Sequence, residues 1–486
     1  MKRILAILAL CGAALGAAQA ATDTVLLLHT NDLHDRIRAS ATGVGGMPYL
    51  SGYIAQARNE RSDVLLLDAG DVMEKGDLLA FETKSSVMYE AMRRIGFHAS
   101  SPGNHDLAYG LDNLRACARL AGFPLLSINL VGPDSKPLFE PSKIFDVDGV
   151  KVGVIGATTS AYVDSDPAAP ARALDLHATV DLIAAEARAL DPQCDLLVAL
   201  CHLGSNACMT IADSVPSLDV IVGAHTHELL LEPMVAKKSG ALIVQVGDSA
   251  RYIGRLDMTI DLDEKRIAAS EYKAVPLAHD STPFDTELAQ WAAECERAVC
   301  PHAAEVLGIA QSEVKGRALS RLIAQGLRRK SGAQIGLDSP DMLRGTLPAG
   351  PIDANAVFMA YVPAGQGEES RREAMTASIS GADLMAYLEK GDSNRGTPVK
   401  AGGEEAMIAQ GTRSFFLTDL DPNQTYSVAL SRGTLEHFCA VAGKTPDELQ
   451  AQSLGFYATD ALAEEIEALT ASGAEIGADE AAAALR

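Results

Sequence analysis

The sequence is poor in aromatic residues and in positive charge, and both shortages limit what the protein can do. Its 486 residues are 5% aromatic and include 41 lysines and arginines against 64 aspartates and glutamates, for a formal net charge of −23. A protein that holds a nucleic-acid polymer through its phosphates needs clustered positive charge, so we do not expect such a partner. A small anionic substrate is compatible with this charge, because a local site with bound cations can differ in sign from the whole surface.

Long apolar runs are also missing, apart from the first twenty residues. These residues, MKRILAILALCGAALGAAQA, combine a basic start (Lys2 and Arg3), an apolar middle and a small-x-small end at 18–20. This order is typical of a cleaved secretory signal, and the apolar stretch is shorter than the roughly 20 residues that span a bilayer. We therefore expect cleavage after Ala20, export to the periplasm and no transmembrane segment in the mature chain. Loss of Lys2 and Arg3 leaves 39 basic against 64 acidic side chains, a net charge of −25.

Cysteine is scarce, with eight in the chain and seven beyond the signal. Because no Cys-x-x-Cys pair occurs, we do not expect a zinc site built from cysteines. Export would permit disulfides. Cys194 with Cys208 and Cys295 with Cys300 are close enough in sequence to pair, and the odd number leaves at least one free thiol.

Short apolar runs alternate with helix-like segments from Thr24 to about Lys273. The runs, rich in Val, Ile and Leu, are TVLLL, DVLLLD, KVGVIGA, CDLLVAL, LDVIVGA and ALIVQVG. Continuous apolar runs of this length are typical of strands buried on both faces. Helices are predicted between them at 47–58, 84–95 and 178–190. The alternation predicts an α/β core in which helices flank sheets.

The length of the chain exceeds one ordinary core, so two or more domains are expected. Helices are predicted in the second part at 317–330, 381–390 and 446–451. The predicted divisions are a signal (1–20), a first domain (22–275), a linker with a helix (276–303), a smaller α/β domain (304–465) and an acidic, alanine-rich tail (466–486) with a frayed end.

Metal-binding residue types stand at the point where each apolar run of the first domain ends. Ligands of open α/β sheets gather at the carboxyl ends of strands. The side chains found there are Asp32 and His34 after TVLLL, Asp71 after DVLLLD, Asn104 and His105 in GNHD, His202 after CDLLVAL, and His225 and His227 after LDVIVGA. Each alone is readily explained as a structural or exposed loop residue. Together they predict a metal centre.

The set contains enough ligands for two cations. Two ions about 3.5–4 Å apart need a bridging carboxylate and several nitrogen or oxygen ligands, and Asp71 is the predicted bridge. The remaining predicted ligands are Asp32, His34 and His227 for one ion and Asn104, His202 and His225 for the other. Imidazole and carboxylate ligands without thiolate suit zinc, manganese, iron or similar divalent ions, and the sequence does not choose among them.

The motifs NDLH, DAGD, GNHD, CHLG and GAHTHE, in this order, resemble those of the calcineurin-like metallophosphoesterases, and the layout resembles the exported bacterial 5′-nucleotidases. The match runs from Thr24 to about Leu256, and GTLPAGPIDANAVF and SISGADLMAYLEKG are similar to family segments farther on. The resemblance implies a four-layer αββα metal domain, a smaller α/β 5′-nucleotidase-type substrate domain and a connecting helix. It also implies that hydrolysis takes place in a metal cleft between the domains.

The resemblance further implies a mechanism. A metal-bound hydroxide attacks phosphorus, and a nucleotide becomes nucleoside and phosphate. His105 is then a catalytic residue that stabilises the transferring group or protonates the leaving oxygen. The family places an aspartate three residues after this histidine, where this chain has Ala108. We expect Asp106 or Glu74 to support His105 instead, against a reading of Asp106 as a local turn residue.

The second domain departs further from the family pattern. Arg344 falls near the family's substrate-binding arginine, but the neighbouring glycines are lost, and Ala364 stands where relatives carry a base-stacking phenylalanine. Phe438 or Tyr457 is a stacking candidate, with packing as the alternative role.

The sequence thus predicts an exported phosphoester hydrolase of the 5′-nucleotidase type, with a small anionic phosphate ester, most simply a nucleotide, as its substrate. Two alternatives stay open: a metal-dependent hydrolase of a non-nucleotide phosphate or sulfur ester, and a metal-binding protein with reduced catalysis. The oligomeric state is left open.

Overall fold

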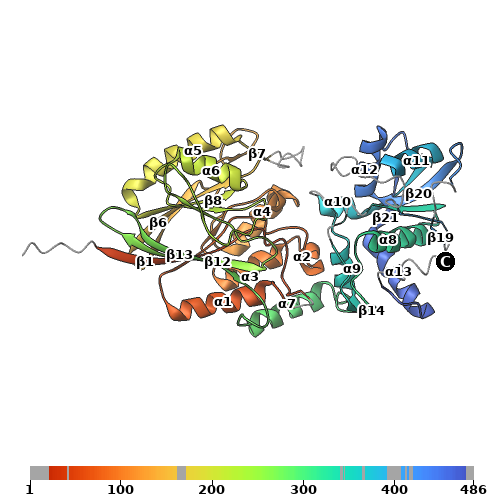
Figure 1. The fold of residues 1–486 in the computed structure, drawn as a ribbon, viewed down its shortest axis with the longest axis horizontal. Helices are drawn as coiled ribbons and strands as arrows, with labels where there is room; N and C mark the ends of the chain where they lie inside the picture. Colours follow the sequence, from red (N-terminus) through yellow and green to blue (C-terminus); the bar gives the residue numbers. More distant parts are fainter. Residues whose placement is uncertain are drawn as a thin grey trace, which may run out of the picture.

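The computed structural model describes residues 21–40, 43–160, 171–339, 343, 345–363, 367–390, 407–410, 413–414 and 420–477. The predicted signal and Arg344 and Ala364 lie outside these residues. Figure 1 shows two lobes, with the amino-terminal lobe coloured red to green and the carboxy-terminal lobe coloured green to blue. Within these residues, no helix is both long enough and apolar enough to cross a membrane.

The apolar runs of the amino-terminal lobe form two sheets. In spatial order, the first sheet consists of β13 (Arg266–Pro276), β12 (Tyr252–Asp261), β1 (Thr22–Thr30), β2 (Val64–Asp68) and β3 (Ala99–Ser100). The second consists of β10 (Met234–Val235), β11 (Leu242–Val244), β9 (Val220–Gly223), β8 (Leu196–His202), β6 (Val150–Thr158) and β5 (Ser142–Val147). β1, β2 and β3 are parallel, as are β6, β8, β9 and β11.

Each sheet is buried on both faces, as the uninterrupted apolar runs predict. In β1, Val25 and Leu27 pack in the core between the two sheets, whereas Leu26 and Leu28 pack against helices. Successive strand side chains point to opposite faces, so a strand between two cores must be apolar at every position.

Helices close the outer faces of the two sheets and complete four layers (Figure 1). The helices against the first sheet are α1 (Met47–Glu60), α2 (Leu78–Glu82), α3 (Ser86–Ile95), α4 (Leu111–Ala121) and α7 (Thr286–Val299). Those against the second are α5 (Leu176–Leu190) and α6 (Ser205–Ser214). Shorter elements are η1 (His105–Leu107), η2 (Asp191–Gln193) and the pair β4 (Leu130–Val131) and β7 (Arg172–Ala173).

Hydrogen bonds pin the carboxyl ends of the first sheet together. Thr30, Asp68 and Ser100 pair across β1, β2 and β3. The Asp68 carboxylate accepts from the hydroxyls of Thr30 and Ser100, both at 2.7 Å. Burial raises the pKa of Asp68 to about 7 despite these bonds. The loops that leave the three strands therefore start side by side.

The carboxy-terminal lobe is a smaller α/β unit. In spatial order, its main sheet consists of β19 (Arg413–Ser414), β18 (Met407–Gln410), β15 (Ile335–Asp338), β20 (Thr425–Ser431), β17 (Glu373–Ser380) and β21 (Gln452–Tyr457). β14 (Val306–Ala310) and β16 (Gly350–Asp353) pair beside it. Its helices are α8 (Gly316–Ser331), α9 (Ala354–Ala360), α10 (Glu368–Arg372), α11 (Gly381–Lys390), α12 (Arg432–Ala442) and α13 (Ala458–Ser472).

Polar and aromatic contacts join the lobes near the start of α2. Asn355, at the start of α9, accepts from the Leu78 amide at 2.8 Å and donates to Asp77 at 3.2 Å. The rings of Phe81 and Phe358 lie 4.9 Å apart, and the Arg372 guanidinium lies 3.7 Å from the Phe358 ring centroid.

The structure confirms the predicted α/β fold class, with a four-layer first part and a smaller α/β second part. The helix predicted at 446–451 is wrong, since this segment forms only hydrogen-bonded turns. The predicted start of the tail, residue 466, falls inside α13, where Ile466 and Leu469 pack into the core together with Ile476.

The suggested disulfides are not formed, because all seven cysteines that the structure describes are free. Cys295 lies in α7 and Cys300 caps its end. Cys300 is buried whereas Cys295 is partly exposed, so the two thiols lie in different surroundings. Cys208 instead lies with its sulfur 3.8 Å from the Cys201 carbonyl, inside the core beneath α5 and α6.

Candidate metal centre

The predicted ligands stand at or just beyond strand ends, and five of them have an unusual backbone. Asp32, His34, Asp71, His225 and His227 all have positive φ, between 48° and 79°. This left-handed conformation is uncommon for residues other than glycine and costs free energy, so its clustering marks a functional site. The loop backbone is held in a strained form that turns these side chains toward one region.

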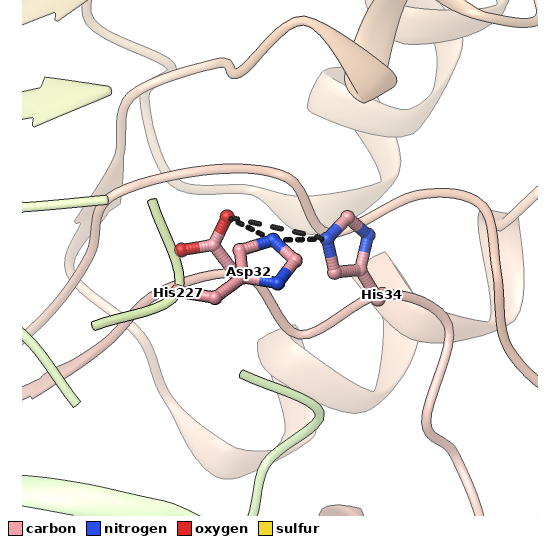
Figure 2. Close-up of side chains that lie close together, drawn as sticks. All are labelled: Asp32, His34 and His227. Atoms are coloured by element: carbon pink, nitrogen blue, oxygen red, sulfur yellow. Dashed lines mark hydrogen bonds and ion pairs between the residues drawn. The ribbon is translucent and has the colours of Figure 1, made fainter. Parts of the chain in front are cut away.

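Three of the side chains converge in a first cluster, shown in Figure 2. The Nε2 atoms of His34 and His227 are 3.1 Å apart, and they lie 4.0 and 3.3 Å from Oδ1 of Asp32. Ligand atoms about 2.0–2.2 Å from one cation are separated by distances of this order. This geometry fits a divalent metal ion between the three groups.

A second cluster consists of Asp71, His202 and His225, whose ligand atoms all lie within 4.8 Å of one another. Nε2 of His202 is 3.1 Å from Oδ2 of Asp71. The His225 amide donates to both carboxylate oxygens of Asp32, at 3.2 and 3.1 Å, so the two clusters are neighbours.

The outer nitrogen of three of these histidines is held by an oxygen. Nδ1 of His34 lies 3.2 Å from the Met73 carbonyl, Nδ1 of His202 lies 2.8 Å from the Ala69 carbonyl, and Nδ1 of His227 lies 3.1 Å from Asp248. When Nδ1 donates to such an oxygen, Nε2 keeps its lone pair for a metal. The donor set therefore fits divalent cations of the imidazole- and carboxylate-binding kind.

The charges of the site shift its pKa values strongly. Burial alone would lower the pKa of His202, but the charge and hydrogen bond of Asp71 raise it to about 10. Burial would also lower the pKa of His227, which hydrogen bonds to Asp248 and Asp32 raise to about 9. For Asp71, burial is outweighed by His202 and His105, and its pKa falls well below the ordinary value. The carboxylates and imidazoles of the site are thus close enough to shift one another's pKa values.

His105 lies beside the first cluster and contacts two charged side chains. Its ring meets the His34 ring edge to face, with centroids 5.1 Å apart. Nδ1 is 2.6 Å from Oε2 of Glu74, and Nε2 is 2.8 Å from Nζ of Lys75. Of the two predicted supports of His105, Glu74 is therefore the one in contact with its ring.

Asp106 serves the backbone of the same region. Its carboxylate accepts from the amides of Gly103, Asp71, Val72 and Met73 at 2.7–3.2 Å, and from the hydroxyl of Tyr89 at 3.1 Å. Burial and the charge of Asp71 raise the pKa of Asp106 to about 6. Asp106 thereby ties the GNHD turn to the loop after β2.

The tight fit of this turn explains its glycine. A Cβ on Gly103 would lie 2.1 Å from Oδ1 of Asp71, closer than any real contact. The same Asp71 oxygen accepts from the His105 amide at 2.8 Å. Asn104 is buried directly before His105, and its role as a ligand stays a prediction.

The stacking residues proposed for the second lobe have different surroundings. Phe438 is fully buried and packs against Tyr387, with ring centroids 4.9 Å apart, so it packs in the core rather than facing a ligand. Tyr457 is partly buried and meets Phe81 edge to face across the lobes at 6.4 Å.

Sequence reasoning missed three residues of the site. Asp248 supports His227, Asn31 holds Asp32 through a 2.7 Å bond to its carboxylate, and Lys75 contacts His105. Asn31 is the first residue of NDLH, and Lys75 lies four residues after Asp71 of DAGD, so both positions carried a signal. Asp248 lies 21 residues beyond His227, and only the fold brings the two together.

Comparison with known proteins agrees with this geometry. Residues 25–229 match the calcineurin-like phosphoesterase family. A 5′-nucleotidase of Vibrio cholerae is 29% identical over 294 residues, which cover 53% of this chain and 52% of that protein. The chain therefore aligns with about half the length of such curated relatives.

Solved structures extend the likeness of the fold over both lobes. The 5′-nucleotidase precursor of Thermus thermophilus superposes with a TM-score of 0.72 at 23% identity and covers 92% of this chain and 97% of its own. The sulfate thiohydrolase SoxB of the same organism superposes with a TM-score of 0.68 at 18% identity and covers 93% and 95%. Residues 25–229, which contain every predicted metal ligand, are thus similar to the calcineurin-like phosphoesterases, and both lobes share the fold of these two solved structures.

Proposed function

We propose that this protein is an exported hydrolase of phosphate monoesters that works with two divalent cations and acts on nucleotides in the manner of a 5′-nucleotidase. The observation that carries the proposal is the convergence of two donor clusters, Asp32–His34–His227 and Asp71–His202–His225, at the carboxyl ends of adjacent strands. The curated relatives named as 5′-nucleotidases support the substrate class.

Two divalent ions would neutralise the phosphoryl oxygens and acidify the attacking water. The two clusters, with Asp71 as bridge and Asn104 as a further ligand, would hold these ions. The oxygens at Nδ1 of His34, His202 and His227 keep the imidazoles aimed at them. A dinuclear site of this kind can place both the phosphoryl group and a water for in-line displacement.

His105 would face the reacting phosphoryl group and stabilise it or protonate the leaving oxygen. Glu74 supports this histidine, since its carboxylate lies 2.6 Å from Nδ1. It takes the role of the aspartate that the family has at the position of Ala108. Asp106 is a positioning residue, because its carboxylate holds backbone amides around Asp71 and not the His105 ring.

A metal-dependence assay tests the activity. The mature protein, stripped with a chelator and reloaded with manganese or zinc, is expected to release p-nitrophenol from p-nitrophenyl phosphate and phosphate from AMP. Catalysis that is absent with every metal would leave the alternative of a metal-binding protein with reduced turnover.

The support of His105 has a separate test. Glu74→Gln keeps the shape but loses the charge at Nδ1, so kcat is expected to fall by roughly 10²-fold with little change in KM. The acidic limb of the pH–kcat profile should move as well. Glu82→Gln, at an exposed residue nearby, is the matched control. An unchanged kcat in Glu74→Gln would contradict the assignment.

A second candidate function is hydrolysis of a non-nucleotide phosphate ester. It is favoured by the burial of Phe438, which is fully enclosed in the second lobe and unable to stack on a base. A panel of AMP, a UDP-sugar, cyclic nucleotides and simple phosphate esters separates the two functions. Nucleotide hydrolysis no faster than that of simple esters would favour the second.

A further inference from the structure

Lys75 lies at the metal centre and has no part in the function proposed above. Its Nζ is 2.8 Å from Nε2 of His105, and the His105 ring is packed against the ring of His34. After burial, the charge of Lys75 is the largest cause of the lowered pKa of His34. The ammonium therefore lies near both the catalytic histidine and the first donor cluster.

The backbone aims Glu74 and Lys75 at the same imidazole. These two consecutive residues both have positive φ, 64° and 69°. Two such residues in a row are uncommon outside glycine and are retained only where the surrounding structure holds them. The Glu74 amide is held by Asp35 at 2.7 Å, and the two side chains reach opposite nitrogens of the His105 ring.

The hydrogen bonds of His105 show which of its ring nitrogens accepts from the Lys75 ammonium. With Nδ1–H paired to the Glu74 carboxylate, Nε2 is an acceptor, and the Lys75 ammonium is its donor. A phosphate oxygen is a better acceptor for an ammonium than a neutral imidazole, because the phosphate carries negative charge. In the function proposed above Nε2 would face the phosphoryl group, and Nζ is 2.8 Å from Nε2, so Nζ would lie near an oxygen of that group.

We propose that Lys75 is a further substrate-binding residue, whose ammonium leaves Nε2 of His105 and binds a non-bridging oxygen of the phosphoryl group. The transfer frees Nε2 to take up a proton from water, which His105 would then give to the leaving oxygen. The ligand class is a phosphate monoester or its product, inorganic phosphate. The inference rests on the proposed function, since it requires a phosphoryl group at the metal centre.

Binding of inorganic phosphate tests this role without turnover. Orthophosphate is titrated calorimetrically into manganese-loaded wild type, Lys75→Met and Lys75→Gln at fixed pH and ionic strength. Lys84→Met is the matched control, because Lys84 is exposed on the neighbouring turn and its loss removes the same charge. Metal content and thermal unfolding are measured for each protein. Lys75→Gln retains a polar side chain of similar reach, so it replaces Lys75→Met if the latter does not fold.

The expected result is a Kd for phosphate raised on the order of 10- to 100-fold by loss of Lys75, and changed less than about twofold in the control. An unchanged Kd with normal metal content overturns the proposal and leaves Lys75 as a support of His105 alone. Wild type that binds no phosphate overturns it too. Wild type that binds phosphate through Lys75 but hydrolyses no ester refutes the proposed function and upholds the binding role.

Discussion

The metal centre of the amino-terminal lobe and the core of the carboxy-terminal lobe hold their buried polar groups in opposite ways. In the amino-terminal lobe, the imidazole nitrogens of His34 and His227 point at each other across 3.1 Å, beside a carboxylate. In the carboxy-terminal lobe, buried Asp338 accepts from the hydroxyls of Ser320 and Thr434, at 2.7 and 3.4 Å. A cation would satisfy both imidazoles and the carboxylate of the first arrangement, whereas hydroxyl donors of the protein satisfy the second.

Backbone strain follows the same division. Of the sixteen non-glycine residues with positive φ in the described parts of the chain, all but Gln450 precede residue 266. Strain of this kind persists where the surrounding structure enforces it for function. Buried polar groups alone therefore do not mark the lobe that carries the metal centre. That lobe is distinguished by converging metal-binding side chains and by a strained backbone.

The largest expected effect is on kcat, and it compares a buried aspartate of the metal centre with a buried aspartate outside it. Asp71→Asn removes the predicted bridging charge, and kcat should fall on the order of a thousandfold, about 4 kcal/mol in activation free energy. Asp219 is the matched control, since it is also largely buried and burial raises its pKa to about 7. Unlike Asp71, it accepts a hydrogen bond from the amide of Leu197, at the start of β8. Asp219→Asn should keep kcat within about threefold, as measured with p-nitrophenyl phosphate. Equal losses in both variants would break the comparison.

A second test uses a buried histidine outside the metal centre. His29 is fully buried, stacks on Tyr272 at 6.0 Å, and burial lowers its pKa from 6.5 to about 3. Between these two pKa values the unfolded chain binds the extra proton, so stability falls as the pH falls. The loss due to this group is about 1.4 kcal/mol per pH unit.

His29→Phe keeps the ring and removes the titration. Urea unfolding at pH 6, 5 and 4 should therefore show a shallower loss of stability than wild type, by about 3 kcal/mol over two pH units. His302→Gln, at an exposed histidine, is the control and should follow wild type. Parallel curves for His29→Phe and wild type would show that burial of this histidine does not drive acid unfolding.

The smallest expected effect concerns the contact between the lobes. Asn355→Ala leaves the Leu78 amide without its buried acceptor and should lower the free energy of unfolding by about 1–3 kcal/mol. Because this bond couples the lobes, the urea transition should also broaden or split. Asn423→Ala, at an exposed turn, should leave the transition unchanged. A single unshifted transition in Asn355→Ala would mean that the lobes are coupled by other contacts.

Much of the fold and of the site could be predicted from the sequence. Residues such as Val25 to Leu28 are apolar without interruption, because both faces of β1 are covered, and this pattern predicted the buried strands. Parallel strands then bring Asp32, Asp71 and His202 to neighbouring edges. The helix expected at 446–451 failed, because short polar segments form single turns as readily as helices.

The sequence by itself determined the six donors of the two clusters and the apolar runs that they follow, because the apolar pattern and the residues after each run are local properties. Only the tertiary structure decided that Asp248 supports His227, that Glu74 rather than Asp106 contacts His105, and that Lys75 lies on the other side of that ring. The physical reason is that these contacts depend on left-handed backbone angles and on loops packed from different sheets. Neither can be predicted from the order of residues along one strand.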